Sequence, residues 1–97
     1  MHHMSSDDER KKAILKQIDE YRREIDKHDE DIVEALGERM KVVKKIAPLK
    51  KEAGIDAEVR EREQEVKRNW QRIASRKSLS GTFVEKILEL ILQESKK

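Results

Sequence analysis

Apolar residues recur at helical spacing along the first half of the chain, over a greater length than one small domain can cover. No Gly or Pro interrupts the pattern before Gly37 and Pro48. A helix from about Lys12 to Glu52 would be roughly 60 Å long, twice the diameter of a small domain. The apolar stripe of this predicted helix consists of Ile14, Ile18, Tyr21, Ile25, Ile32, Leu36, Met40, Val43, Ile46 and Leu49.

Pro48 stands near the end of this predicted helix. A proline lacks a backbone N–H and crowds the preceding turn, which costs roughly 3 kcal/mol inside a helix. The helix should therefore kink or end near Ala47. Because the pattern continues through Leu49 and Lys50, we expect a kink near the C-terminal end of the helix.

A second helix is predicted after the sequence "EAGID". Gly54 suits the left-handed position that closes a helix, and Asp56 can accept hydrogen bonds from the first N–H groups of the next one. The apolar residues of this second helix are Val59, Val66, Trp70 and Ile73.

The sequence "RKSLSGT" breaks the pattern again and introduces a third helix. Ser80 or Thr82 is the expected N-cap, and Thr82 with Glu85 predicts a capping box. The apolar residues that follow are Phe83, Val84, Ile87, Leu88, Leu90, Ile91 and Leu92.

The fold predicted from these patterns is all-α, with one long and two shorter helices per chain. Two short helices cannot cover the apolar stripe of a helix twice their length. We therefore expect an intertwined dimer, in which the long helices of two chains pack together and the short helices cover part of the partner. A long antiparallel coiled coil is the simpler form of the same solution.

Composition excludes several classes of protein. Of 97 residues 45% are charged, and 23 Lys and Arg against 21 Asp and Glu give a net charge of only +2. The two signs are interspersed, so nucleic-acid binding is not indicated.

The longest apolar run, near Ile91 and Leu92, is far shorter than the roughly 20 residues that span a bilayer. Residues 1–11 resemble a tag remnant and polar leader without a signal peptide, and there is no Cys, so we expect a cytoplasmic protein without disulfides.

Polar side chains stand on the apolar face of the long helix. Arg39 and Lys50 are 11 residues apart, an angular offset of only about 20°, and they share a face with Val43 and Ile46. Arg22 precedes Arg39 by 17 residues, an offset of roughly 100°. Arg22 would therefore face a different neighbour.

The two shorter helices repeat this pattern. The stripe through Val66 and Trp70 leads back to Arg62, with Glu63 beside it, and the seam of the third helix leads on to Ser95. Taken singly, such residues usually extend to the surface, pair with a carboxylate or are incidental. Taken together they indicate a site, because burying several unpaired cations costs several kcal/mol each.

A small ligand with two carboxylates would satisfy these cations, since a guanidinium group matches a carboxylate in bidentate fashion. The sequence contains no cluster of metal ligands, no nucleophile with an adjacent base and no Gly-rich phosphate loop. A reaction at such a site would depend on positioning and electrostatics.

These residues resemble the all-helical (AroQ-type) chorismate mutase family. The similarity runs without a gap over about residues 18 to 95, from "YRREIDKHDEDIVEALGERMKVVKKIAPLK" through "REREQEVKRNW" to "FVEKILELILQES". Its most specific elements are the R-x-x-I-x-x-x-D pattern from Arg22, the "ER" at Arg39 and the lysine 11 residues later. The "RE" in the second helix and the serine near the end of the third agree in order and spacing.

The resemblance implies that residues 12–97 form a chorismate mutase-like domain that rearranges chorismate to prephenate in aromatic amino acid biosynthesis. It implies a homodimer with two shared active sites and no cofactor or metal. Arg39 and Arg62 would hold substrate carboxylates, and Arg22 would reach into the partner's site. Lys50 would donate to the ether oxygen of the breaking bond, Glu63 would accept from the ring hydroxyl, and Ser95 would contact a carboxylate.

Some features depart from the family pattern and leave alternatives open. Many members carry a Gln or Glu donor one turn beyond the serine, at a position past Lys97. Either Lys50 would act alone on the ether oxygen, or Lys96 or Lys97 would supply the second donor. Pro48 is unusual so close to Lys50. The acid and arginine of the second helix could also be Arg60 and Glu61, although Arg62 and Glu63 keep the apolar stripe in register. The alternative functions are an isochorismate-pyruvate lyase and an inactive helical scaffold.

Overall fold

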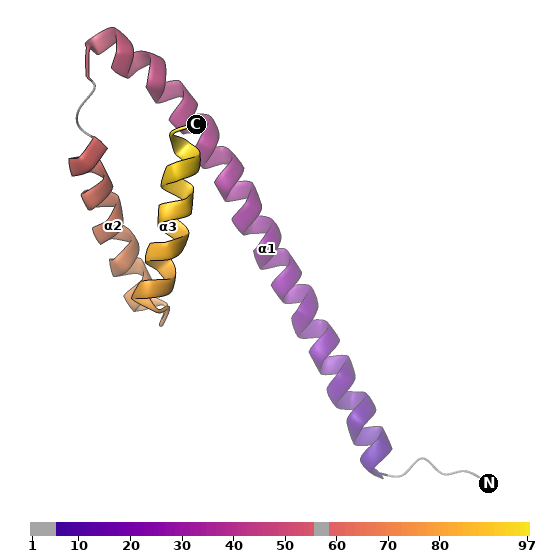
Figure 1. The fold of residues 1–97 in the computed structure, drawn as a ribbon. Helices are drawn as coiled ribbons and strands as arrows, with labels where there is room; N and C mark the ends of the chain where they lie inside the picture. Colours follow the sequence, from indigo (N-terminus) through magenta and orange to yellow (C-terminus); the bar gives the residue numbers. More distant parts are fainter. Residues whose placement is uncertain (1–5, 56–58) are drawn as a thin grey trace. The chain divides into compact units, whose positions relative to one another are not determined.

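The computed structural model describes residues 6–55 and 59–97, which form three α-helices and no strand (Figure 1). Helix α1 spans Ser6–Ala53, α2 spans Val59–Arg76 and α3 spans Gly81–Ser95. The predicted all-α fold, with one long and two shorter helices, is confirmed. The chain divides within α1 into two compact units, Met1–Arg39 and Met40–Lys97.

Helix α1 begins at Ser6, earlier than the expected start near Lys12, and includes residues from the predicted polar leader. Its first turn carries Asp7, Asp8 and Glu9, whose negative charges interact favourably with the exposed N–H groups at a helix N-terminus. This extension has no apolar face, so hydrophobic periodicity could not detect it.

The apolar stripe of α1 is present and lies open in the protomer. No residue of α1 is buried, and in the first unit the side chains of Ile25 and Ile32 are 55% and 57% exposed. Other apolar residues of this unit that remain exposed are Ile14, Leu15, Ile18, Tyr21 and Val33. Within the first unit, this stripe therefore has no covering partner among the described residues.

The end of α1 is set by glycine. Helix α1 continues through Pro48, and its last turns curve in Figure 1. Gly54 adopts φ +67°, as predicted, while its N–H donates to Lys51 O (3.2 Å) and the N–H of Ile55 donates to Lys50 O (2.9 Å). This pair of bonds is a Schellman cap. The predicted N-cap of the next helix, Asp56, lies outside the described residues.

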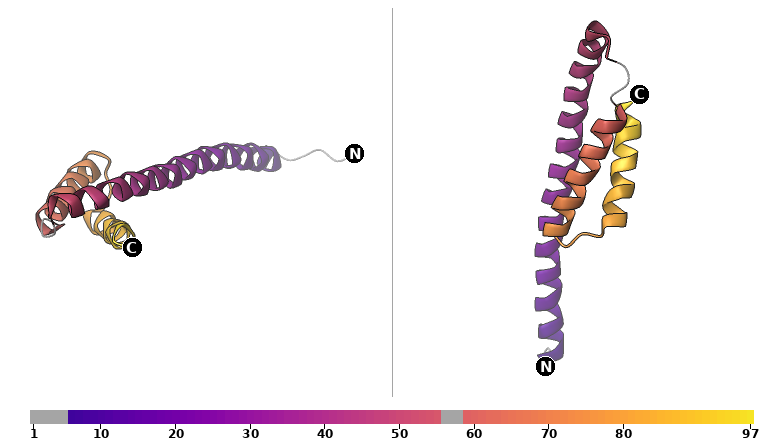
Figure 2. Two further views of the ribbon diagram at one scale, coloured as in Figure 1. Left: turned by 90° about the horizontal axis from the view of Figure 1, so that it is seen from above. Right: turned by 90° about the vertical axis from the view of Figure 1, so that its left-hand side faces the viewer.

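In the second unit, α2 and α3 lie side by side as an antiparallel hairpin (Figures 1 and 2). Polar contacts also join the helices: Lys67 Nζ lies 2.6 Å from Glu85 Oε1, and Gln71 Nε2 donates to Gly81 O (3.0 Å). The residues buried between the helices are Val66, Ala74, Val84, Leu88 and Ile91. The predicted seam of the third helix is thereby confirmed.

Helix α3 is capped by Ser80, whose Oγ accepts a hydrogen bond from the N–H of Phe83 (3.3 Å). The prediction of a capping box from Thr82 and Glu85 was wrong, because Thr82 already lies inside the helix and Glu85 pairs with Lys67. The hydrogen bond and charge of Glu85 raise the pKa of Lys67 above the ordinary value of 10.5.

The turn between α2 and α3 also uses a Schellman cap, but with a serine in the left-handed position. Ser78 has φ 57°, its N–H donates to Ser75 O (3.4 Å), and the N–H of Leu79 donates to Ala74 O (2.9 Å). A side chain in this conformation costs roughly 1–2 kcal/mol that glycine does not incur.

We therefore expect Ser78→Gly to stabilise the protein by roughly 0.5–1 kcal/mol, since the greater freedom of glycine in the unfolded chain offsets part of the gain. Urea unfolding followed by circular dichroism measures the change. The matched control is Ser75→Gly, which places glycine inside α2 and should destabilise by several tenths of a kcal/mol. A loss of stability in Ser78→Gly would contradict the strain assigned to this turn.

Candidate active site

Two predicted site residues, Glu63 and Ser95, lie where the first turns of α2 approach the C-terminal end of α3. Glu63 of α2 is half-buried, and one of its oxygens, Oε1, is removed from solvent. Lys96, the C-cap residue of α3, places Nζ 2.8 Å from this oxygen. The contact is an ion pair, but no donor in the described chain makes a well-aligned hydrogen bond to Oε1.

Ser95 lies next to this pair in the chain and is half-buried. Its Oγ donates to Ile91 O (2.8 Å) and also contacts Met40 Sδ at 3.6 Å. Because Met40 belongs to the part of α1 in the second unit, this contact joins the end of α3 to α1. The structure thus brings Glu63 and the Ser95–Lys96 end of α3 into one region.

Lys50 is half-buried in the last turn of α1, within the second unit. Its carbonyl oxygen is part of the Schellman cap described above, so the backbone that carries its side chain is fixed immediately before Gly54. Of the residues in its turn, Lys51 and Leu49 are exposed. Lys50 is therefore less exposed than the residue on either side of it.

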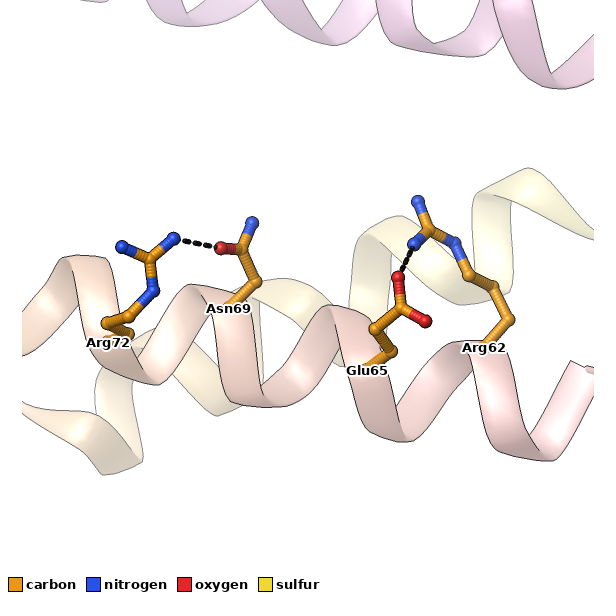
Figure 3. A network of polar contacts seen from close by, with 4 residues as sticks. All are labelled: Arg62, Glu65, Asn69 and Arg72. Carbon is orange, nitrogen blue, oxygen red and sulfur yellow. Dashed lines mark hydrogen bonds and ion pairs between the residues drawn. The ribbon is translucent and has the colours of Figure 1, made fainter.

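Arg62 lies beside Glu63 in sequence but projects to the surface of α2. Its side chain is 66% exposed and its Nη1 lies 2.5 Å from Glu65 Oε1. Figure 3 places this pair on the same face of α2 as the hydrogen bond between Arg72 and Asn69. In the protomer, the stripe through Val66 and Trp70 leads to Glu63 and leaves Arg62 in solvent.

The alternative arginine and acid of α2 receive no support from burial. Arg60 and Glu61 are both exposed, whereas Glu63 is half-buried three residues before the buried Val66. The register that pairs Arg62 with Glu63 is therefore the one in which the acid faces the helical core.

The other two arginines predicted at the site, Arg22 and Arg39, belong to the first unit. Arg22 is 72% exposed, and its Nη1 lies 3.6 Å from Asp19 Oδ1, one turn earlier on α1. Arg39 is half-buried. An exposed ion pair between residues one turn apart on a helix contributes little to stability. Breaking the contact with Asp19 so that Arg22 can bind another anion therefore costs little free energy.

The chemistry available to this set is that of anion binding and hydrogen bonding. It comprises cations on α1 and α2 and one acid with a buried, under-satisfied oxygen. Within residues 6–55 and 59–97, no three His, Cys, Asp or Glu side chains are grouped so that they could hold a metal ion. No helix in that part of the chain is long and apolar enough to cross a membrane.

Two contacts of this region were not anticipated from the sequence. Lys96 was considered only as a substitute donor, and its ion pair with Glu63 depends on how α3 ends against α2. The contact between Ser95 and Met40 joins residues 55 positions apart in the chain. No periodic pattern on either helix could indicate which residues of the other helix they meet.

The chain is similar to known proteins over most of its length. The family model for chorismate mutase type II matches residues 21–97. A bifunctional chorismate mutase/prephenate dehydratase of Aquifex aeolicus (strain VF5) is 34% identical over 80 residues, 82% of this chain but only 22% of the relative. No solved structure gives a significant match. Because the family model matches most of the chain, the chain belongs to the chorismate mutase type II family.

Proposed function

We propose that the protein rearranges chorismate to prephenate, in a cytoplasmic step of aromatic amino acid biosynthesis. The observation that carries the proposal is the extent of the family match, because residues 21–97 include all the predicted site residues. These are Arg22, Arg39, Lys50, Arg62, Glu63 and Ser95.

The rearrangement is an intramolecular [3,3] shift in which one C–O bond breaks while one C–C bond forms. It requires no nucleophile and no external acid. The enzyme must hold a flexible dianion in its folded conformation and stabilise the negative charge that develops on the ether oxygen. A set of fixed cations with one acceptor for the ring hydroxyl is suited to both tasks.

In this mechanism each residue has a separate task. Arg39 and Arg62 bind the substrate carboxylates, and Ser95 contacts a carboxylate. Lys50 donates to the ether oxygen, and Glu63 accepts from the ring hydroxyl. Arg62 would leave its surface partner, Glu65, to do so, a change that costs little because exposed ion pairs contribute only about 0–1 kcal/mol.

The active form we propose is a homodimer in which Arg22 enters the site of the partner. Two features support it: the apolar side chains of α1 in the first unit are exposed, and Arg22 is exposed on the same helix. Packing two copies of the stripe together would remove its apolar side chains from water, at roughly 25 cal/mol for each Å² buried.

An assay of the purified chain with chorismate tests the function, and a native mass tests the dimer. We expect prephenate to form in the absence of any added cofactor, from a species of twice the chain mass. Formation of pyruvate from isochorismate without prephenate from chorismate would identify the lyase instead. No turnover of either substrate would favour a helical scaffold and contradict the proposal.

A further inference from the structure

The ion pair between Glu63 and Lys96 is not explained by the roles assigned above. Lys96 Nζ lies 2.8 Å from Glu63 Oε1, and the lysine side chain is 59% exposed while that of the acid is 30% exposed. The charge of Lys96 is therefore directed at the acid from the solvent side. On the basis of the proposed function, we infer that Lys96 is a positioning residue. It holds the Glu63 carboxylate in the orientation that accepts a hydrogen bond from the substrate hydroxyl.

The first step of the argument concerns Glu63 itself. A carboxylate that loses part of its hydration is costly unless a cation or hydrogen-bond donors replace the water. Oε1 is out of contact with solvent and has no well-aligned donor from the described chain, so the ammonium group of Lys96 is the compensating charge there. Removing this charge would favour rotation of the carboxylate towards water.

The second step concerns the backbone that carries Lys96. This residue caps α3 in a helical conformation, φ −91° and ψ −5°, and its N–H donates to Gln93 O at 3.2 Å. The neighbouring Ser95 is bound to Ile91 O and contacts Met40. The last turn of α3 is thus ordered by its own hydrogen bonds, and it directs Lys96 towards α2.

The third step concerns what remains available on the acid. The contact with Lys96 is made by Oε1, the oxygen that is removed from solvent, so the second oxygen, Oε2, of the half-buried side chain remains to accept a hydrogen bond. A hydroxyl group of a bound molecule can donate to Oε2 while the ammonium group of Lys96 keeps its place at Oε1. Lys96 therefore orients Glu63 without occupying its capacity to accept a hydrogen bond.

The test is a double-mutant cycle measured as kcat/KM for chorismate. We expect Lys96→Met to lower kcat/KM roughly tenfold in the wild-type background and by less than about twofold in a Glu63→Gln background, because the lysine acts through the carboxylate. Lys96→Arg should restore most of the loss, since it keeps the charge. The control is Lys86→Met, which removes an exposed lysine from the same helix and should leave kcat/KM unchanged.

Two results would overturn the inference while the proposed function stands. One is unchanged kcat/KM in Lys96→Met, which would make the ion pair a surface contact without consequence. The other is an equal loss in both backgrounds, which would mean that Lys96 acts on structure or directly on substrate. Absence of turnover by the wild-type chain would overturn the proposed function together with the inference.

Discussion

Lys50→Ala is expected to lower kcat/KM for chorismate by at least about two orders of magnitude without changing the native mass. The reason is that a donor fixed at the ether oxygen interacts most strongly with charge that appears only in the transition state. One such donor contributes roughly 3–4 kcal/mol in other enzymes. Initial rates of prephenate formation measure the effect.

The chain offers a closely matched control for this variant. Lys51 is the next residue of α1, carries the same charge and is exposed, whereas Lys50 is half-buried. Lys51→Ala should therefore retain nearly full turnover, so that a loss in Lys50→Ala cannot be attributed to helix propensity or net charge. Equal turnover in the two variants would remove Lys50 from the role assigned to it.

The second large effect is expected from the apolar stripe. Ile32→Lys places a charge on the part of α1 that the proposed dimer covers, and twofold symmetry introduces the change twice. Lost burial of two isoleucines alone costs roughly 3–6 kcal/mol, and two desolvated ammonium groups add to it. We expect the native mass to fall to that of one chain and turnover to fall with it, since in the proposed dimer each site takes Arg22 from the partner.

Glu34→Lys provides the comparison for Ile32→Lys. Glu34 is exposed on α1 two residues further on, roughly 200° around the helix, and it receives the same substituent. This variant should remain dimeric and active. If Ile32→Lys kept the mass of two chains and full turnover, the stripe would not be the dimer interface, and the crossing role of Arg22 would lose its basis.

Much of the helical architecture could be predicted because it is encoded locally. Gly54 closes α1 in the left-handed conformation, Ser80 caps α3, and the seam of Val84, Leu88 and Ile91 is buried as its spacing indicated. Each of these features depends on residues within one or two turns of one another. The periodicity of a single helix is sufficient to reveal them.

The errors and omissions arose where local alternatives compete or where a signal lacks periodicity. Thr82 with Glu85 matched a capping box, but Lys67 on the neighbouring helix offers Glu85 an opposite charge. Ser78 adopts a positive φ that its residue type does not indicate. The early start of α1 at Ser6 depends on acidic residues without an apolar face.

The candidate site was only partly predictable for a different reason. The sequence indicated which residues face inward, and burial supports Glu63, Lys50 and Ser95 in that respect. It could not indicate that Arg62 would find Glu65 in solvent, because a long flexible side chain chooses among partners that differ by less than about 1 kcal/mol. The shared site and the dimer remain predictions, since they depend on a second chain.

The distribution of buried residues also bears on the order in which the protein folds. In the described chain they all belong to α2 and α3, and none belongs to α1. The hairpin can therefore consolidate in a first-order reaction, whereas in the proposed dimer the apolar stripe of α1 is covered only when two chains meet. Refolding would then contain a slower, second-order phase, and the melting temperature would rise with protein concentration.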